Sequence, residues 1–251
     1  MSGIVHLVGA GPGAADLLTL RAARLLAEAD VVLHDALVSP EVLELATRAR
    51  LIPVGKRAGR PSAEQAFICR LMIRAARTGR SVVRLKGGDP FLFGRAEEEI
   101  AACRAAGIAV EVVPGVSAGF AAAAALCAPL TRRGLARSVA FLTPAAAKGA
   151  APDTRWADAA AGADTLVIYM GKRDGPRVLA ALLARGLSPA TPLVLAESVS
   201  WTGETLSGGT LGDLAALSGA AGDGPALLLL GEVFAEAAAA HAPAARGVRR
   251  A

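Results

Sequence analysis

Residues 82 to 95 read VVRLKGGDPFLFGR, an apolar run that leads directly into a cluster of glycines. Val82 to Leu85 is typical of a buried strand, and Gly87-Gly88-Asp89-Pro90 is typical of the turn after one. Glycines at the carboxyl end of a strand let a ligand approach the backbone closely. Open α/β sheets bind their ligands at this position. The stretch therefore predicts a strand, a ligand-binding loop and a helix that begins near Arg95.

The segments on both sides of this stretch alternate between strand and helix. Strands are expected at 4–8, 31–33, 51–54 and 109–113, separated by helices from Asp16 as N-cap to Ala29, from Ser39 onward, from Ser62 to Thr78 and over 95–106. Pro53 places its strand near an edge of the sheet. This alternation predicts an α/β fold with a largely parallel sheet covered by helices.

The pattern changes at PGVSAG, residues 114–119, which an alanine-rich helix follows. Further strands are expected at 138–143, 165–170, 193–197 and 226–230, with helices over 174–185 and 210–217, the latter capped by Thr210 and Asp213. We therefore expect two α/β domains, 1–113 and 114–240, and a flexible tail over 241–251.

The composition bounds the class of protein. The 251 residues are 53% hydrophobic and 20% charged, so the chain can bury a large core. Its net charge of +5 fits either a solvated basic surface or an anionic partner. Three cysteines without metal-ligand spacing predict free thiols in a reducing cytoplasm and no metal site. The longest apolar run, Ala118 to Leu130, is shorter than the roughly 20 residues that a membrane span needs.

A second glycine turn lies in HLVGAGPGAADLLTL, residues 6–20. Gly9, Gly11 and Ala14 have the spacing of a dinucleotide fingerprint, and Asp35 stands where a ribose-binding acid would follow. Pro12, however, has no N–H, so the turn lacks a donor that a pyrophosphate would need. The turn therefore favours a ligand without a pyrophosphate.

The motifs GAGPG, D-x-LVSPE, VGKRAG, RLKGGDPF-x-FGR, VPGVSA and IYMG occur in the order found in the tetrapyrrole methylase family, and the likeness covers about residues 3–234. The chain resembles most closely the members that act on uroporphyrinogen III. The resemblance implies a homodimeric enzyme of two α/β domains, dependent on S-adenosylmethionine (SAM), with its active site in the cleft between the domains. It further implies methylation of C2 and C7 of uroporphyrinogen III to give precorrin-2, the precursor of sirohaem and cobalamin.

The resemblance also implies a set of site residues. The positions that match the family's SAM site are Pro12, Gly87, Gly88, Asp89, Leu92, Ser117, Ala118, Met170 and Val199. Asp35 matches the proposed catalytic base and Lys56 the proposed proton donor, although a turn carboxylate and a solvated lysine are the alternatives. The substrate carries carboxylates on every ring, and the arginines that could bind them, or simply be solvated, are Arg57, Arg60, Arg132 and Arg133.

Some positions depart from the family pattern and keep other functions open. The histidine of the family's PLTHR is Arg132, the histidine of its T-G-H is Ala145, and the aromatic residue before the catalytic aspartate is His34. The alternatives are a methylase of another corrin precursor or of ribosomal RNA, and a non-catalytic tetrapyrrole-binding protein. Aromatic residues make up only 4% of the chain and do not interleave with basic clusters, so no nucleic-acid partner is expected.

Overall fold

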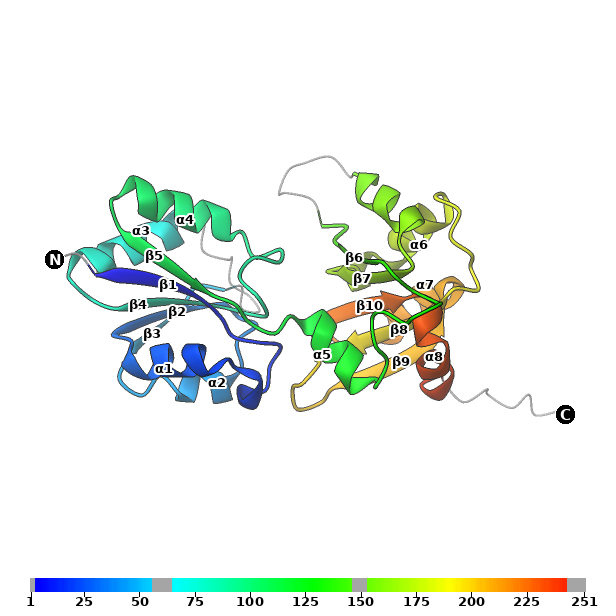
Figure 1. Cartoon of the computed structure of the whole chain (residues 1–251), viewed down its shortest axis with the longest axis horizontal. Coiled ribbons are helices and arrows are strands. Elements are labelled where there is room, and N and C mark those ends of the chain that lie inside the picture. The colour runs from blue at the N-terminus through cyan, green and yellow to red at the C-terminus, as the bar shows by residue number, and fades with distance from the viewer. Residues whose placement is uncertain (1–2, 56–64, 146–152, 243–251) are drawn as a thin grey trace, which may run out of the picture. The chain divides into compact units, whose positions relative to one another are not determined.

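We describe the chain from a computed structural model, which covers residues 3–55, 65–145 and 153–242 (Figure 1). The chain forms two compact units that divide between Ala118 and Gly119. We call them unit 1 and unit 2 and describe each by itself. The sequence analysis placed the division at 114. Residues 114–118 stay with unit 1, where the Gly115 N–H donates a hydrogen bond to Asp89 (3.0 Å).

Unit 1 contains a five-stranded sheet in which all neighbouring strands are parallel. The strands, in the order β3-β2-β4-β1-β5, are β3 (Arg50–Pro53), β2 (Val31–His34), β4 (Val82–Lys86), β1 (Ile4–Gly9) and β5 (Ala109–Val113). β2 and β4 are buried along their whole length, as expected for a sheet covered on both faces. The predicted parallel sheet is confirmed, and Pro53 lies on an edge strand as predicted.

Helices cover both faces of this sheet (Figure 1). Those on one face are α1 (Leu20–Glu28) and α2 (Pro40–Glu44), and those on the other are α3 (Gln65–Arg77) and α4 (Ala96–Ala105). Alternate residues of β1 feed the two cores, because Leu7 packs with α3 and α4 while Val8 packs with α1 and α2. Cys69 and Cys103 are free thiols, as predicted, and they are buried in the core that Leu7 forms with α3 and α4.

The predicted caps in unit 1 have different outcomes. Ser39 accepts a hydrogen bond from the Val42 N–H and caps α2, with Pro40 in the first turn as expected. The prediction for Asp16 is wrong, because α1 begins later and Thr19 accepts the bond from the Ala22 N–H (3.1 Å). Asp16 instead lies in a short 3-10 turn, Ala15–Leu17, that carries the chain from the glycine turn to the helix. Ser62 lies outside the described residues.

Unit 2 contains a mixed five-stranded sheet in the order β6-β7-β10-β8-β9. Its strands are β6 (Val139–Leu142), β7 (Thr165–Tyr169), β10 (Ala226–Leu230), β8 (Pro192–Glu197) and β9 (Thr205–Thr210). β6 and β7 are parallel, whereas β10 is antiparallel to both β7 and β8, and β8 is antiparallel to β9. The parallel sheet that the sequence predicts belongs to unit 1, and for unit 2 the sequence predicted an α/β domain without a strand direction.

The strand β9 was not predicted from the sequence. It reads TLSGGT, which has neither an apolar run nor an alternating pattern. Gly208 is required there, since a Cβ at this position would lie 2.0 Å from the Ala238 carbonyl oxygen of α8 (Ala235–Ala240). The glycines of β9 are therefore explained by the close approach of a helix, and they do not indicate a loop.

Two helices of unit 2, α6 (Gly175–Leu183) and α7 (Leu214–Ala220), pack around one apolar core together with the 3-10 helix Arg155–Gly162. The helix α5 (Ala118–Ala125) precedes the first strand of this unit. The predicted capping pair is present, because Asp213 accepts hydrogen bonds from the Thr210 N–H (2.9 Å) and hydroxyl (2.8 Å). Among the described residues, no helix has the length and apolar character needed to cross a bilayer.

Candidate functional site

The loops after β1 and β4 are joined by their backbones in unit 1. The Gly88 N–H donates a hydrogen bond to the Gly11 carbonyl (2.7 Å), and the Gly11 N–H donates one to the Gly88 carbonyl (3.3 Å). Both glycines have positive φ values, 71° for Gly11 and 68° for Gly88, which residues with a Cβ rarely adopt. The two predicted glycine loops thus form one structure at the carboxyl ends of neighbouring parallel strands.

The loop after β5 packs against the same structure without room for side chains. A Cβ on Gly9 would lie 2.6 Å from the Gly115 backbone and 2.7 Å from the Gly88 carbonyl oxygen. A Cβ on Gly115 would lie 2.3 Å from that same oxygen. Three strand ends therefore come into close contact through their glycine backbones.

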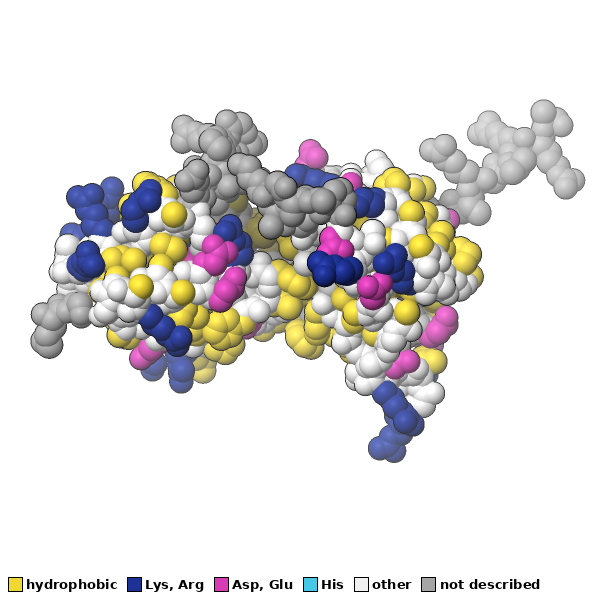
Figure 2. All heavy atoms as spheres, turned by 90° about the horizontal axis from the view of Figure 1, so that it is seen from above, with side chains coloured by type: hydrophobic (Ala, Val, Ile, Leu, Met, Phe, Trp, Pro, Cys, Tyr) yellow, Lys and Arg dark blue, Asp and Glu magenta, His cyan; other side chains and the backbone are white. Residues whose placement is uncertain are grey.

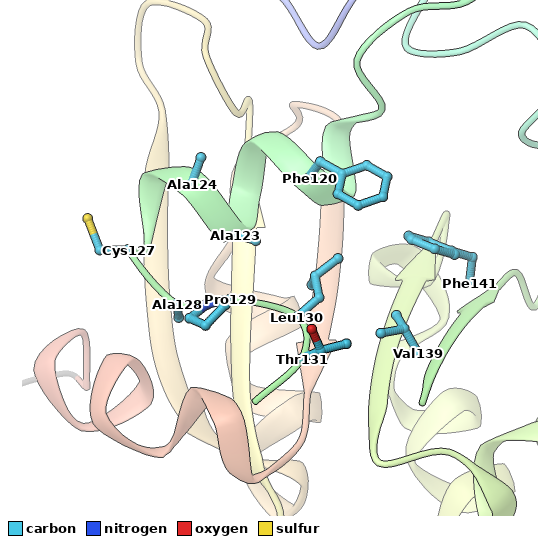
Figure 3. Close-up of a pocket in the computed structure, with 10 residues that line it drawn as sticks. All are labelled: Phe120, Ala123, Ala124, Cys127, Ala128, Pro129, Leu130, Thr131, Val139 and Phe141. Carbon is cyan, nitrogen blue, oxygen red and sulfur yellow. The ribbon is translucent and has the colours of Figure 1, made fainter. Parts of the chain in front are cut away.

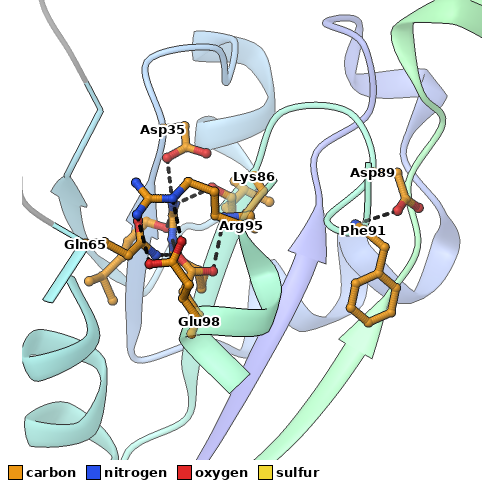
Figure 4. Close-up of polar contacts among 11 residues, drawn as sticks. Asp35, Gln65, Lys86, Asp89, Phe91, Arg95 and Glu98 are labelled. Carbon is orange, nitrogen blue, oxygen red and sulfur yellow. Dashed lines mark hydrogen bonds and ion pairs between the residues drawn. The ribbon is translucent and has the colours of Figure 1, made fainter. Parts of the chain in front are cut away.

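Asp89 links two of these loops. Its carboxylate accepts one hydrogen bond from the Gly115 N–H (3.0 Å) and another from the Phe91 N–H (2.8 Å), the latter visible in Figure 4. Each carboxylate oxygen of Asp89 therefore accepts a hydrogen bond from a backbone amide. The side chain of this predicted SAM contact stabilises the loops themselves, which leaves the backbone around it to face a ligand.

The loops fit a nucleoside ligand better than a pyrophosphate. The N–H groups of Gly11 and Gly88 are engaged with each other, and the Ala10 N–H donates to the Lys86 carbonyl (2.7 Å). Two amides of the turn, those of Ala10 and Gly11, are therefore already used, and Pro12 has none. Gly88 faces open space, because a Cβ there would have only the Ser117 Cα within 4 Å, at 3.9 Å. This arrangement permits close approach of a ligand to the backbone.

The structure brings all the predicted cofactor positions of unit 1 to this edge of the sheet. Pro12 and Ser117 are buried, whereas Leu92 is partly exposed. The predicted positions on the loops after β1, β4 and β5 are Pro12, Gly87, Gly88, Asp89, Leu92, Ser117 and Ala118. The remaining two, Met170 and Val199, belong to unit 2.

Met170 and Val199 follow two strands of unit 2 that end at the same edge. β7 and β8 are both antiparallel to β10 and so run in the same direction. Met170 has a left-handed backbone (φ 58°) and is 54% exposed, whereas Val199 is buried between Ser198 and Ser200, which are also left-handed. Such strained residues cluster at ligand-binding loops. Five of the six described non-glycine residues with positive φ lie in the loops discussed here, namely Phe93, Arg95, Met170, Ser198 and Ser200.

A buried ion pair holds the two strand ends of unit 2 together. The Lys172 ammonium donates hydrogen bonds to Glu197 (2.5 Å) and to the carbonyls of Gly222 and Gly224 (both 2.6 Å). Burial alone would raise the pKa of Glu197, but the bonds from Lys172 and from backbone N–H groups outweigh it and hold the pKa below its ordinary value. This pair was not predicted from the sequence, although Lys172 directly follows the IYMG motif.

The predicted substrate arginines of unit 2 lie on an exposed turn. Arg132 and Ala136 form an antiparallel bridge, and Arg133 lies between them. Thr131 and Leu130, which precede this turn, line a cavity of about 540 Å³ (Figure 3). The rings of Phe120 and Phe141 face one another at this cavity with centroids 5.7 Å apart. The cavity is apolar, and Arg132 and Arg133 place positive charge in the adjoining segment.

Asp35 lies at the end of β2 and is paired with a buried arginine. The Arg84 Nη2 donates a hydrogen bond to Asp35 Oδ1 (2.6 Å), and the Arg84 side chain is 3% exposed against 30% for Asp35. Burial alone would lower the pKa of Arg84, but the carboxylates of Asp35 and Glu99 outweigh it and raise the pKa. Arg84 is therefore charged and holds the predicted base by a charge-assisted bond.

Arg84 belongs to a cluster that the sequence analysis did not predict (Figure 4). Glu99 of α4 is fully buried and accepts hydrogen bonds from Arg84 (2.9 Å), Lys86 (3.0 Å) and Gln65 (2.9 Å). Burial and the neighbouring Arg84 lower the pKa of Lys86, against the opposing effect of Glu99 and Asp35. The sequence carried one signal for this cluster, since charged residues inside a buried strand must have partners.

Three predicted residues, Lys56, Arg57 and Arg60, lie outside the described residues. Gly55, which directly precedes Lys56, is described, and a Cβ there would lie 2.1 Å from the Ala36 nitrogen. The VGKR motif therefore begins against the backbone that follows Asp35. Among the described residues, no group of three or more His, Cys, Asp or Glu side chains could hold a metal ion.

The glycine loops, their order along the chain and the acid beside them are the features of a tetrapyrrole methylase. The chain matches the family model described as Tetrapyrrole (Corrin/Porphyrin) Methylases over residues 5–215, and it belongs to this family. The resemblance predicted from the motifs is therefore confirmed.

Particular relatives are close. The chain is 48% identical over 234 residues to the uroporphyrinogen-III C-methyltransferase of Pseudomonas aeruginosa, which covers 93% of this chain and 95% of that protein. It is 47% identical over 235 residues to the siroheme synthase of Tolumonas auensis, which covers 93% of this chain but 50% of that protein. The chain thus spans about half the length of that siroheme synthase.

A solved structure shows the same fold. The uroporphyrin-III C-methyl transferase of Thermus thermophilus, complexed with S-adenyl homocysteine, is 41% identical to this chain with a TM-score of 0.81. The match covers 92% of this chain and 99% of that one. The predicted α/β fold class is therefore confirmed, whereas the cleft that the family implies between the two domains stays a prediction.

Proposed function

We propose that the chain is a SAM-dependent methyltransferase that methylates C2 and C7 of uroporphyrinogen III to give precorrin-2, for sirohaem or cobalamin synthesis. The observation that carries the proposal is the meeting of Gly11 and Gly88, whose amides bond to each other and leave an open backbone surface beside Ser117. Membership of the tetrapyrrole methylases and the names of the close relatives support the same activity.

The residues present fit SAM. SAM has an adenosine and a sulfonium but no pyrophosphate, so loops whose amides are already engaged can hold it. Pro12, Gly87, Gly88, Asp89, Leu92, Ser117 and Ala118 would bind it from unit 1, and Met170 and Val199 from unit 2. When bound, SAM supplies a methyl group whose transfer to an electron-rich ring carbon depends chiefly on positioning.

The remaining steps concern protons and substrate charge. Asp35 is the proposed base that removes a proton from the methylated ring, and Lys56 is the proposed donor. The guanidinium groups of Arg57, Arg60, Arg132 and Arg133 are suited to the carboxylates of the tetrapyrrole. We further propose that the enzyme acts as a homodimer in the cytoplasm. Lys and Arg side chains lie in separate small groups with acidic ones among them on the face shown in Figure 2, which does not favour an RNA partner.

The proposed substrate is tested by measuring methyl transfer to it. The chain is incubated anaerobically with uroporphyrinogen III and SAM, and release of S-adenosylhomocysteine is followed together with the mass of the tetrapyrrole. A gain of two methyl groups is expected. Tight SAM binding with no gain would refute the substrate and favour another corrin precursor or RNA. Tetrapyrrole binding without methyl transfer by a SAM-bound chain would favour a non-catalytic protein.

A pair of matched variants tests the SAM site. Gly88 and Gly107 have nearly equal φ values, 68° and 70°, and neither has a close neighbour where a Cβ would lie. Valine at either position costs similar backbone strain, about 1–3 kcal/mol. Gly88→Val should weaken S-adenosylhomocysteine binding by about tenfold or more, a loss of ~1.4 kcal/mol, whereas Gly107→Val should not. Equal affinities in a calorimetric titration would move the cofactor away from this loop.

A further inference from the structure

The guanidinium of Arg84 is held on all sides within unit 1. Its Nε donates to Glu99 Oε1 (2.9 Å) and its Nη2 to Asp35 Oδ1 (2.6 Å). Its Nη1 donates to the carbonyls of Leu85 (3.0 Å) and Leu33 (3.4 Å). A planar guanidinium that donates to this many acceptors is fixed in one orientation. The position of Asp35 Oδ1 is therefore set by β4 rather than by the loop that carries Asp35.

Glu99 is the carboxylate on which Arg84, Lys86 and Gln65 converge. Its Oε1 accepts from Arg84 and Gln65, and its Oε2 accepts from Lys86, so both oxygens are engaged in a site with no exposure to solvent. Asp35, Arg84, Glu99 and Lys86 together carry two negative and two positive charges. A buried cluster of this size is tolerated only when its charges balance and its hydrogen bonds are made.

One member of the cluster reaches the surface. The side chains of Arg84, Lys86 and Glu99 are 3%, 4% and 0% exposed, whereas that of Asp35 is 30% exposed. Arg84 engages Oδ1 of Asp35, and among the contacts described for this carboxylate none involves Oδ2. Three buried charged groups thus support a single carboxylate oxygen at the edge where the glycine loops lie.

We propose that Arg84 and Glu99 are positioning residues for the methylation, Glu99 holding Arg84 and Arg84 holding Asp35 with Oδ2 directed to the substrate. This inference rests on the proposed function, in which Asp35 is the base. The proton leaves the methylated ring and forms a bond to Oδ2, while the electron pair that it leaves restores the ring. Arg84 and Glu99 exchange no proton in this step.

The groups that face Asp35 come from several elements. Arg84 and Lys86 face it from β4, Glu99 from α4, Gln65 and Cys69 lie behind Glu99 on α3, and the ring of His34 bonds the Asp35 carbonyl (3.1 Å). Loss of Arg84 removes the hydrogen bond that fixes Oδ1. The kcat should then fall while the KM for the tetrapyrrole and the Kd for S-adenosylhomocysteine stay unchanged.

The test is a double-mutant cycle on the full chain, read as kcat, the KM for the tetrapyrrole and the Kd for S-adenosylhomocysteine. Arg84→Met should lower kcat about tenfold or more, with KM and Kd unchanged. Asp35→Asn should lower kcat by about 10²–10⁴-fold, the usual contribution of a general base. In the Asp35→Asn background, Arg84→Met should have no further effect, because it acts through Asp35.

Two more variants keep the test decisive. Glu99→Gln preserves the shape of the cluster but loosens Arg84, and it should lower kcat with KM and Kd unchanged, even if Arg84→Met fails to fold. Glu98→Gln, one residue away on α4 and paired with exposed Arg95, removes the same charge and should leave kcat unchanged.

An unchanged kcat in Arg84→Met, or a loss of kcat that persists at full size in the Asp35→Asn background, would overturn the positioning role. Full activity in Asp35→Asn alone would instead overturn Asp35 as base, and the positioning role with it. Loss of S-adenosylhomocysteine binding by Asp35→Asn would also overturn Asp35 as base, and the positioning role with it. The turnover assay separates these results from failure of the proposed substrate.

Discussion

Replacing Gly9 by alanine should damage both the stability of unit 1 and its affinity for SAM. The added Cβ would lie 2.6 Å from the Cα and nitrogen of Gly115 and 2.7 Å from the Gly88 carbonyl oxygen. All three are backbone atoms, so no side chain can rotate away. Ordinary contact begins at 3.4 Å, and the strand ends must therefore separate by about 0.8 Å. Overpacking of this kind costs about 1–3 kcal/mol.

That cost can be measured in two ways. In a protein of this size it corresponds to a decrease in Tm of about 2–12 °C. Displacing the Gly88 carbonyl also disturbs its bond with Gly11, so calorimetric titration should show S-adenosylhomocysteine binding about tenfold weaker, ~1.4 kcal/mol. Gly162→Ala is the control, because Gly162 has no positive φ and nothing within 4 Å of the added atom. A Gly9→Ala variant that matches this control in both Tm and affinity would refute the reasoning.

The remaining predictions concern acid stability and thiol reactivity. The pKa of Glu197 is held below its ordinary value of 4.5 in the folded chain, so the pair with Lys172 stabilises unit 2 above that pH and the stabilisation is lost as pH falls through the lowered pKa. Glu197→Gln should therefore lower the urea midpoint at pH 7 and flatten its fall below pH 4.5; an equally steep fall would contradict this. Burial raises the pKa of the Cys103 thiol to about 11, so iodoacetamide at neutral pH should modify the exposed Cys127 first, as mass spectrometry of peptides would show. Prior labelling of Cys103 would show that its burial is transient.

The fold of unit 1 could be predicted from the sequence because each of its parts is local. Buried parallel strands read as apolar runs, and turn residues separate them from amphipathic helices. Unit 2 was harder for a physical reason. Strand direction in a mixed sheet depends on which strands become neighbours, and β10 lies between β7 and β8 although other elements separate them in sequence. No local pattern records that pairing.

The candidate site likewise has parts that local sequence signals predict and parts that depend on contacts between residues distant in sequence. The glycine loops were predicted from their own residues, since glycines after a strand are a local signal of close approach. The bond between Asp35 and Arg84 joins residues 49 apart in sequence, and it forms only because β2 and β4 are neighbours. An arginine in the run VVRLK signalled that a partner exists but did not identify Asp35 or Glu99 as that partner.

The two parts of the unit 1 site, the glycine loops and the buried charge cluster, lie at one edge of the sheet but depend on different physics. The loops are held by backbone hydrogen bonds, by close glycine contacts and by the hydrogen bonds from two backbone amides to the Asp89 carboxylate. The cluster is held by charge, and Asp35 is its exposed member. Under the proposed function, changes in the loops should therefore weaken SAM affinity with little effect on kcat at saturating SAM. Changes in the cluster should lower kcat with no effect on affinity, and a variant of Gly9 or Gly88 that lowered kcat at saturating SAM would show that the two parts are coupled.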